Sequence, residues 1–265
     1  MKNRKGARTK KDIPIEVLAL LNKGELSSVN LTEWLAIDQK LLVSNVLLAL
    51  DRKDYISIVL GNIDKLKKPT VNSVNQCIGY TLFDISKERG DIELFGLLKT
   101  HTSDLVRCWA AYFVGFNDSL RIDEKLEAIK YFAGDDHFGV REIAWMSVRE
   151  SITNHLEESI KLLLEWTHSE NANIRRFATE STRPRGVWCK HIEVLKEQPE
   201  LAVCLLEELK DDSSKYVRDS VSNWLNDAAK TKPTFVIDLC NLWLCNDPLN
   251  KNLMGTIKKA KRNLQ

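Results

Sequence analysis

Apolar residues recur at helical spacing along most of the chain. Val74, Ile78, Leu82 and Ile85, for example, follow one another at steps of three or four residues, the spacing of one face of an α-helix. The sequence shows no sustained apolar–polar alternation and no Asn-Gly turn, so β-strands are not expected. The pattern predicts an all-α protein. Helices are expected over residues 12–24, 31–50, 55–66, 71–87, 92–99, 105–116, 122–132, 140–152, 156–166, 173–182, 201–209, 217–229 and 235–244, with a short helix in the basic C-terminal tail.

A Val-Arg or Ile-Arg pair lies near the start of four of these helices. The arginines are Arg107, Arg141, Arg175 and Arg218, at steps of 34, 34 and 43 residues. Polar residues just before each pair can cap the helix by accepting hydrogen bonds from its free backbone N–H groups. HEAT-like two-helix repeats have a period of about 40–47 residues. The pattern therefore predicts an α-solenoid of HEAT-like repeats, and the alternative is an ordinary helical bundle with incidental pairs.

The second helix of such a repeat usually lines the concave face of a solenoid. We therefore expect the repeat arginines and Arg176 near one inner surface, with Trp109, Trp145 and Phe177 close behind them. Two alternatives stay open from sequence. Such an arginine can instead bond the acidic caps of the neighbouring repeat, and an aromatic residue at helical spacing can belong to the core.

Charge divides the chain into three parts. Residues 1–11 hold six basic residues and residues 251–265 hold five, with no acidic residue in either segment. The chain has a net charge of +2, so residues 12–250 carry about −9. We expect a basic flexible N-terminal tail (1–11), a single repeat domain (12–250, best defined over 91–247) and a basic C-terminal tail (251–265). An acidic body can bind nucleic acid only through a local basic face together with such tails.

Several functional classes find no support in the sequence. It has no phosphate-binding loop, no dinucleotide-binding glycine pattern and no serine-hydrolase elbow. The six cysteines form no Cys-x-x-Cys pair, so neither a metal site nor another cofactor is expected. No apolar run reaches the length of a membrane helix. We expect a cytoplasmic monomer of bacterial type.

Two segments are more distinctive than the general repeat. Residues 174–185 read Ile-Arg-Arg-Phe-Ala-Thr-Glu-Ser-Thr-Arg-Pro-Arg, and residues 216–230 read Tyr-Val-Arg-Asp-Ser-Val-Ser-Asn-Trp-Leu-Asn-Asp-Ala-Ala-Lys, with Pro233 following. Both resemble motifs of the AlkC/AlkD family of bacterial DNA alkylation repair proteins, the first in the form of the AlkC branch. The resemblance is specific over about residues 135–247.

The resemblance implies a C-shaped stack of repeats that holds duplex DNA in its concave cleft. Catalytic members of the family excise N-alkylated purines such as 3-methyladenine and 7-methylguanine. Arginine and lysine side chains hold phosphates, aromatic side chains pack against the damaged nucleotide, and a carboxylate stabilises the developing sugar cation. An alkylated purine is already cationic, so a nearby carboxylate favours the oxocarbenium-like transition state.

The chain departs from the family pattern where the catalytic acid is expected. That position falls at Ala144 or Trp145, and Glu142 is the nearest acidic substitute. Ser181 also stands where the family often has glycine. Glu142 is therefore the candidate catalytic residue, and whether the protein is an enzyme stays open. The candidate DNA-binding residues are Arg141, Trp145, Arg149, Arg175, Arg176, Arg183, Arg185, Trp188 and Lys190.

Three functions are compatible with these observations. The first is a DNA-binding repair protein that excises N-alkylated purines as an N-glycosylase and is associated with the nucleoid when bound. The second is a non-catalytic reader of branched or distorted DNA. The third is a solenoid scaffold for a protein partner, which the acidic body favours because a charge of about −9 over residues 12–250 disfavours general attraction to DNA.

Overall fold

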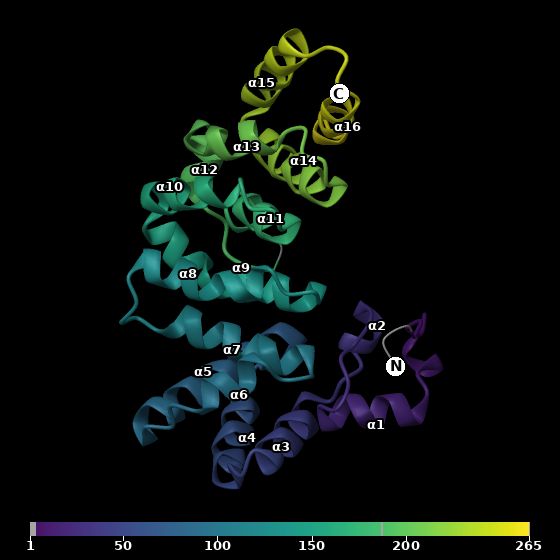
Figure 1. The fold of residues 1–265 in the computed structure, drawn as a ribbon, viewed down its shortest axis with the longest axis vertical. Helices are drawn as coiled ribbons and strands as arrows, with labels where there is room; N and C mark the ends of the chain where they lie inside the picture. Colours follow the sequence, from purple (N-terminus) through teal and green to yellow (C-terminus); the bar gives the residue numbers. More distant parts are fainter. Residues whose placement is uncertain (1–3, 187, 265) are drawn as a thin grey trace. The chain divides into compact units, whose positions relative to one another are not determined.

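The computed structural model describes residues 4–186 and 188–264, and every regular element in those residues is a helix. The all-α prediction from apolar spacing is therefore confirmed (Figure 1). The chain forms two compact units. Unit 1 comprises residues 1–119 and 135–147, and unit 2 comprises residues 120–134 and 148–265. Helix α9 (Phe138–Asn154) contributes its first part to unit 1 and its remainder to unit 2.

Unit 1 consists of helices packed in neighbouring pairs. Besides the start of α9, its elements are η1 (Lys10–Asp12), α1 (Ile15–Lys23), α2 (Leu31–Trp34), α3 (Gln39–Ala49), η2 (Lys53–Tyr55), α4 (Ile56–Asp64), α5 (Val71–Arg89), α6 (Leu94–Lys99) and α7 (Asp104–Phe116). α5 packs along α7, α4 packs on α5, α6 packs on α7, and α1 packs on α3. Leu42, Ile78, Leu82 and Trp109 are fully buried in this core. Burying such side chains supplies most of the driving force for folding.

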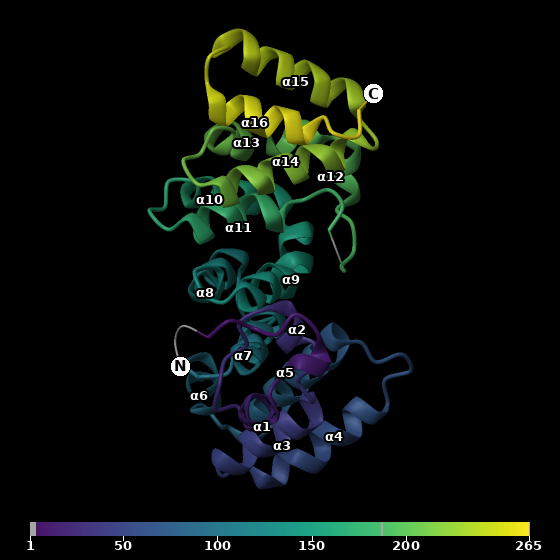
Figure 2. The same ribbon diagram turned by 90° about the vertical axis from the view of Figure 1, so that its right-hand side faces the viewer.

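Unit 2 continues the pairwise arrangement. Besides the end of α9, its elements are α8 (Ile122–Ala133), α10 (Leu156–Trp166), α11 (Ala172–Ser181), α12 (Glu193–Glu197), η3 (Pro199–Ala202), α13 (Val203–Leu209), α14 (Lys215–Ala229), α15 (Pro233–Asn246) and α16 (Lys251–Ala260). α14 contacts both α11 and α16, and it lies between them in both views (Figures 1 and 2). Val221, Trp224 and Leu225 of α14 are fully buried, so this helix is the centre of the unit.

The Val-Arg and Ile-Arg pairs lie at the starts of α7, α9, α11 and α14. The valines of three pairs are fully buried, which fixes the orientation of α7, α9 and α14. The aromatic residues that follow, Trp109, Trp145 and Phe177, are also buried. They therefore occupy the core in the described structure, which is the alternative that the sequence left open for them.

Capping residues define the ends of two helices in unit 1. The Asn30 side chain accepts a hydrogen bond from the Glu33 backbone N–H at 3.0 Å and so caps α2. Gly90 ends α5 with φ of 67°, a left-handed conformation that glycine adopts without a steric penalty.

The two basic tails make ordered contacts where the structure describes them. Arg4 donates to Glu33 Oε2 at 2.7 Å and to the Ser27 carbonyl at 2.9 Å. In the C-terminal segment, Leu253 and Ile257 of α16 are buried. Residues 1–3 and 265 lie outside the described residues. The flexible tails and the single repeat domain over 12–250 stay predictions.

Candidate nucleic-acid interface

The four repeat arginines close the loops that precede their own helices. Nη1 of Arg107 and Nη1 of Arg175 each donate to the carbonyl oxygens six and five residues upstream, at 2.8 and 3.0 Å in both cases. Arg141 and Arg218 also bond the carbonyl oxygen six residues upstream. Each of these arginines therefore orders the loop that precedes its helix.

Two of these arginines also bond an aspartate in the loop before the next Val-Arg helix. Arg107 donates to both carboxylate oxygens of Asp135 at 2.8 and 3.1 Å. Arg175 makes the same paired contact with Asp212 at 2.6 and 2.9 Å. Two parallel N–H···O bonds to one carboxylate fix direction as well as distance. In the loop before α11, the residue that corresponds to these aspartates is Ser169, six residues before Arg175.

The electrostatics of Asp212 show that this link is favourable. Burial alone would raise the pKa of Asp212, but the hydrogen bonds from Arg175 and from the Ser214 backbone N–H outweigh it and hold that pKa below its ordinary value. The hydrogen bond to Asp212 raises the pKa of Arg175. The sequence analysis did not identify the linking aspartates. A signal was present, because each lies six residues before a repeat arginine.

The first family-like motif forms a largely buried ion network in unit 2. The Arg176 guanidinium lies 4.3 Å from the centre of the Tyr216 ring, and its Nη2 lies 3.3 Å from a carboxylate oxygen of Glu180. Glu180 is also 3.3 Å from Arg183, whose Nε and Nη2 donate to Asp227 at 2.9 and 2.7 Å. The network joins α11 to α14. The predicted contacts of Arg175, Arg176 and Arg183 with DNA stay predictions, and the structure gives all three intramolecular partners.

Arg149 of α9 is buried beneath the segment that follows α11. Its guanidinium donates to the carbonyl oxygens of Ser181, Arg183 and Lys190 at 2.8, 2.5 and 3.0 Å. Gly186 packs directly against it, since a Cβ at Gly186 would lie 3.0 Å from the Arg149 guanidinium carbon. Burial lowers the pKa of Arg149. Its predicted contact with DNA stays a prediction, and the geometry assigns it a role in holding this segment.

Residues 183–186 and 188–191, here called the basic loop, contain Arg183, Arg185, Lys190 and His191 and no acidic residue. The loop is closed at its base, because the backbone N–H of residue 192 donates to the carbonyl of residue 184 at 3.0 Å. The Lys190 side chain is 93 % exposed, and its ammonium lies 3.9 Å from Glu150. Arg185 is half-buried. The basic loop therefore presents positive charge to solvent on a closed backbone.

Trp188 is the exposed aromatic residue of the basic loop. It is 83 % exposed, whereas each of the other six tryptophans is at most 6 % exposed. Its φ of 65° lies in the left-handed region, which is uncommon for residues other than glycine. Sequence reasoning put Trp145 and Trp188 in one group, and the structure separates them into a core residue and a surface residue.

The candidate catalytic residue Glu142 lies on α9 beside Trp145. The Trp145 indole N–H donates to Glu142 Oε2 at 2.9 Å. Glu142 is half-buried. Ala144 and Trp145, the two positions where the family pattern places its acid, are both buried. Glu142 is therefore a carboxylate in a defined position, and its catalytic role stays a prediction.

Ser28, Asp104 and His137 form a buried cluster that sequence reasoning missed. Asp104 accepts hydrogen bonds from the Ser28 backbone N–H and hydroxyl, both at 2.8 Å, and His137 Nε2 lies 3.1 Å from the same hydroxyl. His137 Nδ1 accepts from the Gly139 N–H at 3.1 Å, so the proton of the neutral ring is on Nε2. An imidazole in that tautomer cannot take a proton from Ser28, and the cluster is therefore not a nucleophilic site.

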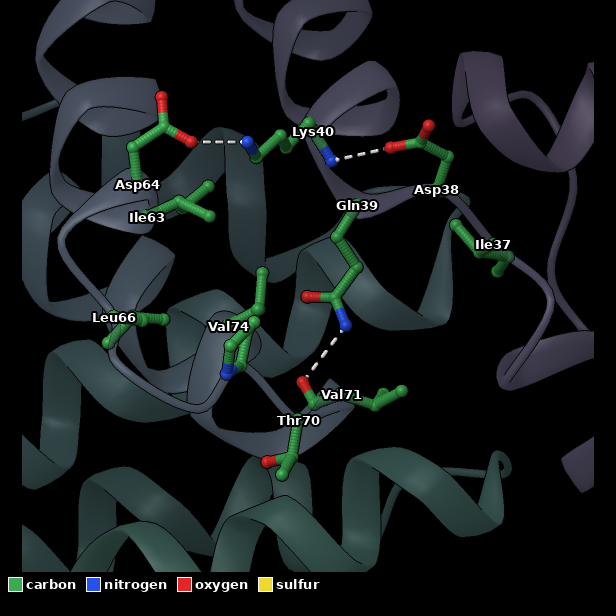
Figure 3. A pocket seen from close by; sticks show the side chains of 11 residues that line it. Ile37, Asp38, Gln39, Lys40, Ile63, Asp64, Leu66, Thr70, Val71 and Val74 are labelled. Carbon is green, nitrogen blue, oxygen red and sulfur yellow. Dashed lines mark hydrogen bonds and ion pairs between the residues drawn. The ribbon is translucent and has the colours of Figure 1, made fainter.

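A pocket of about 410 Å³ lies in unit 1 between the starts of α3 and α5 and the end of α4 (Figure 3). Ile63 and Val74 line it together with Lys40 and Gln39. The Gln39 amide donates to the Val71 carbonyl at 2.9 Å, and Figure 3 shows this side chain reaching across to the start of α5. The pocket contains none of the predicted site residues, and no sequence motif indicated it.

Within residues 4–186 and 188–264, no group of three or more His, Cys, Asp or Glu side chains is placed to hold a metal ion. No helix in the described part of the chain is long and apolar enough to cross a membrane.

Comparison with known proteins connects the geometry of unit 2 to a family. Residues 140–241 match the family described as DNA alkylation repair enzyme. The uncharacterized protein YhaZ of Bacillus subtilis (strain 168) is 37 % identical over 122 residues, which are 46 % of this chain and 33 % of YhaZ. The matched part of the chain thus spans about a third of the length of that relative.

Two solved structures share the fold. The alkylpurine DNA glycosylase AlkC of Pseudomonas fluorescens, bound to DNA containing an abasic site analog, matches with a TM-score of 0.69 and 23 % identity over 98 % of this chain and 65 % of AlkC. AlkD2 of Streptococcus mutans matches with a TM-score of 0.60 and 24 % identity over 79 % of this chain and 97 % of AlkD2. Residues 140–241 of the chain therefore match the DNA alkylation repair enzyme family, and the fold of the chain is similar to that of AlkC and AlkD2.

Proposed function

We propose that this protein is a DNA-binding repair protein that contacts the phosphate backbone through the basic loop. The observation that carries the proposal is the position of Lys190 and Arg185 on a closed, acid-free loop inside the segment that matches the family. Exposed lysine and arginine side chains bind phosphates without reading sequence. The buried arginines of unit 2 support this surface, because Arg149 and Arg183 hold the loop in place.

Excision of N-alkylated purines is the reaction proposed for this protein, with Glu142 as the carboxylate. A carboxylate held by the Trp145 indole N–H is preorganised, which is what stabilisation of a sugar cation requires. AlkC, with which the chain shares its fold, is named as an alkylpurine DNA glycosylase. The proposed lesions are 3-methyladenine and 7-methylguanine.

A second candidate is a non-catalytic reader of branched or distorted DNA. One observation favours it, namely that the positions expected for the catalytic acid, Ala144 and Trp145, carry no carboxylate and are buried. In this case the basic loop would bind DNA in the same way and Glu142 would only orient Trp145.

The proposal of DNA binding is tested by removing the two cations of the basic loop. We expect the double variant Arg185→Ala/Lys190→Ala to bind a duplex at least tenfold more weakly at low salt, because each lost phosphate contact removes one released counterion. The slope of log K against log salt should fall by about 1.8, or about 0.9 per contact. Fluorescence anisotropy with a labelled duplex at several salt concentrations measures both quantities.

Lys161→Ala is the matched control, since Lys161 is an exposed lysine of α10 in the same unit. It should change neither the affinity nor the slope. An unchanged slope in the double variant, or an equal loss in the control, would contradict the role of the basic loop. Absence of duplex binding by the wild-type protein would contradict DNA binding itself.

A further inference from the structure

The pocket of unit 1 contains a buried hydrogen-bond acceptor. Gln39, the first residue of α3, is 7 % exposed and lines this pocket. Its Nε2 donates to the Val71 carbonyl at 2.9 Å. A backbone carbonyl can only accept, so this bond determines which end of the amide is nitrogen and which is oxygen. Among the residues that the structure describes, none donates a hydrogen bond to Gln39 Oε1.

This oxygen is directed toward the pocket. Figure 3 shows it turned away from the Val71 carbonyl and toward the side on which Val74 lies. A buried polar group without a partner has lost its hydration and gained no hydrogen bond in exchange. A molecule that brings a donor into the pocket would therefore be held by Gln39.

The walls of the pocket determine the rest of the ligand. The volume of about 410 Å³ lies in the range of about 300–1,000 Å³ that is typical of small-molecule sites. Such sites combine apolar walls, which supply affinity, with a few polar groups that fix orientation. The apolar lining residues here are Ile37, Ile63, Leu66, Pro69, Val71 and Val74.

The charged side chains of the lining are Asp38, Lys40 and Asp64, and each has a counterpart. Lys40 forms an ion pair with Asp64, which Figure 3 also shows. Asp38 caps α3 by accepting from the backbone N–H groups of Lys40 and Leu41 at 3.0 and 3.1 Å. An ionic ligand would lose hydration here without gaining an ion pair, so the lining favours an uncharged one.

We propose that this pocket binds a small, uncharged molecule that has an apolar ring system and an N–H group, and that the N–H group donates to Gln39 Oε1. The pocket belongs to unit 1 and the basic loop to unit 2. The inference is therefore independent of the proposed contact with DNA.

Two probes that differ in one donor test the inference on the full chain. Indole has a ring N–H group, and N-methylindole carries a methyl group in its place. The wild-type protein should bind indole about fivefold more tightly, the size of effect that one net hydrogen bond gives. Titration calorimetry measures both affinities. The side-chain amide signal of Gln39 in nuclear magnetic resonance, assigned by its absence in Gln39→Met, should shift with indole.

Three variants locate the binding. Gln39→Met keeps the length of the side chain and removes the acceptor, so it should bind the two probes equally. Val74→Phe fills the pocket and should bind neither probe. Gln76→Met is the matched control, since Gln76 is an exposed glutamine of α5 outside the lining. It should bind both probes as the wild-type protein does.

Three results would overturn the inference. The first is that the wild-type protein binds neither probe, which would mean that the pocket holds solvent only. The second is that it binds both probes equally well, and the third is that Val74→Phe binds indole as tightly as wild type does. If Gln39→Met has a lowered melting temperature, the comparison of the two probes on the wild-type protein still decides. The duplex affinity of the Arg185→Ala/Lys190→Ala variant tests the proposed function separately.

Discussion

At the scale of single residues, two carboxylates of α9 show how surroundings give the same chemical group different uses. Glu142 accepts a hydrogen bond from the Trp145 indole and is half-buried. Glu150, about two turns further along the helix, is exposed and lies 3.9 Å from Lys190. A fixed, partly desolvated carboxylate stabilises a cation more strongly than a solvated one does. Glu142 is therefore the one that fits the proposed excision.

Replacing Glu142 by glutamine tests that assignment. Glutamine keeps the shape and can still accept the Trp145 hydrogen bond, so the fold should be retained. We expect the release of 3-methyladenine and 7-methylguanine from methylated duplex DNA to fall by a factor on the order of 10²–10³. Chromatography of the released bases, with an enzyme-free sample for spontaneous loss, measures the rate.

Glu150→Gln is the control on the same helix and should release bases at the wild-type rate. Equal rates for wild type and Glu142→Gln, both above the enzyme-free sample, would show that another group carries the chemistry. If the wild-type protein releases nothing and still binds duplex DNA, the second candidate function replaces excision.

At the scale of elements, the basic loop depends on a side chain from a helix that is distant in sequence. Arg149→Met keeps much of the length of the side chain but leaves the carbonyl oxygens of Ser181, Arg183 and Lys190 without their donor. Each unsatisfied buried group costs about 1–3 kcal/mol. We expect the loop to open locally, so that trypsin cleaves after Arg185 and Lys190 at least tenfold faster than in wild type.

Arg141→Met provides the comparison for this prediction. Arg141 lies on the same helix, but it donates a hydrogen bond to the Asp135 carbonyl, which lies outside the basic loop. It should leave cleavage after Arg185 and Lys190 unchanged. If Arg149→Met is cleaved no faster at these sites than Arg141→Met, Arg149 does not hold the loop closed. Mass spectrometry of the early fragments identifies the cleavage sites.

The sequence predicted these elements well because helices depend on local patterns. The spacing of Val74, Ile78, Leu82 and Ile85 located α5 to within two residues at its end. The partners of the repeat arginines were not predicted, because the link between Arg175 and Asp212 depends on tertiary packing. Trp188 could have been distinguished from Trp145, since it follows proline and glycine and lies outside any helical period.

At the scale of the whole molecule, two half-buried histidines of unit 1, His101 and His137, link stability to pH. Burial lowers the pKa of His101, and Arg107 lowers it further. Burial also lowers the pKa of His137. The nearby Asp104 carboxylate raises this pKa, Arg107 lowers it, and the Ser28 hydrogen bond and Asp135 raise it. The net result is a pKa of His137 below its ordinary value. Both histidines therefore bind a proton less readily in the folded state than in the unfolded state.

The sign of the effect follows from proton linkage. Below the ordinary histidine pKa of about 6.5, the unfolded chain holds more protons at these two sites than the folded chain does. The free energy of unfolding therefore falls as the pH falls below about 6.5, and it continues to fall until the folded histidines also take up protons. The lowered carboxylate pKa values of Asp91, Asp212 and Asp219 act only at more acidic pH.

We accordingly expect the melting temperature to be lower at pH 5.5 than at pH 7.5, and His101→Gln to reduce this difference. Calorimetry of both proteins across that interval measures it. His137→Gln is a second variant, but it also disturbs the hydrogen bond that the Gly139 N–H donates to His137. For this variant the change of melting temperature with pH is therefore more informative than the melting temperature itself. A melting temperature that rises on acidification would mean that the attraction of Asp104 for a protonated His137, at 3.5 Å, outweighs burial. In that case the Ser28–Asp104–His137 cluster would stabilise unit 1 more at acidic pH than at neutral pH. This is the opposite of the effect that burial of His137 predicts.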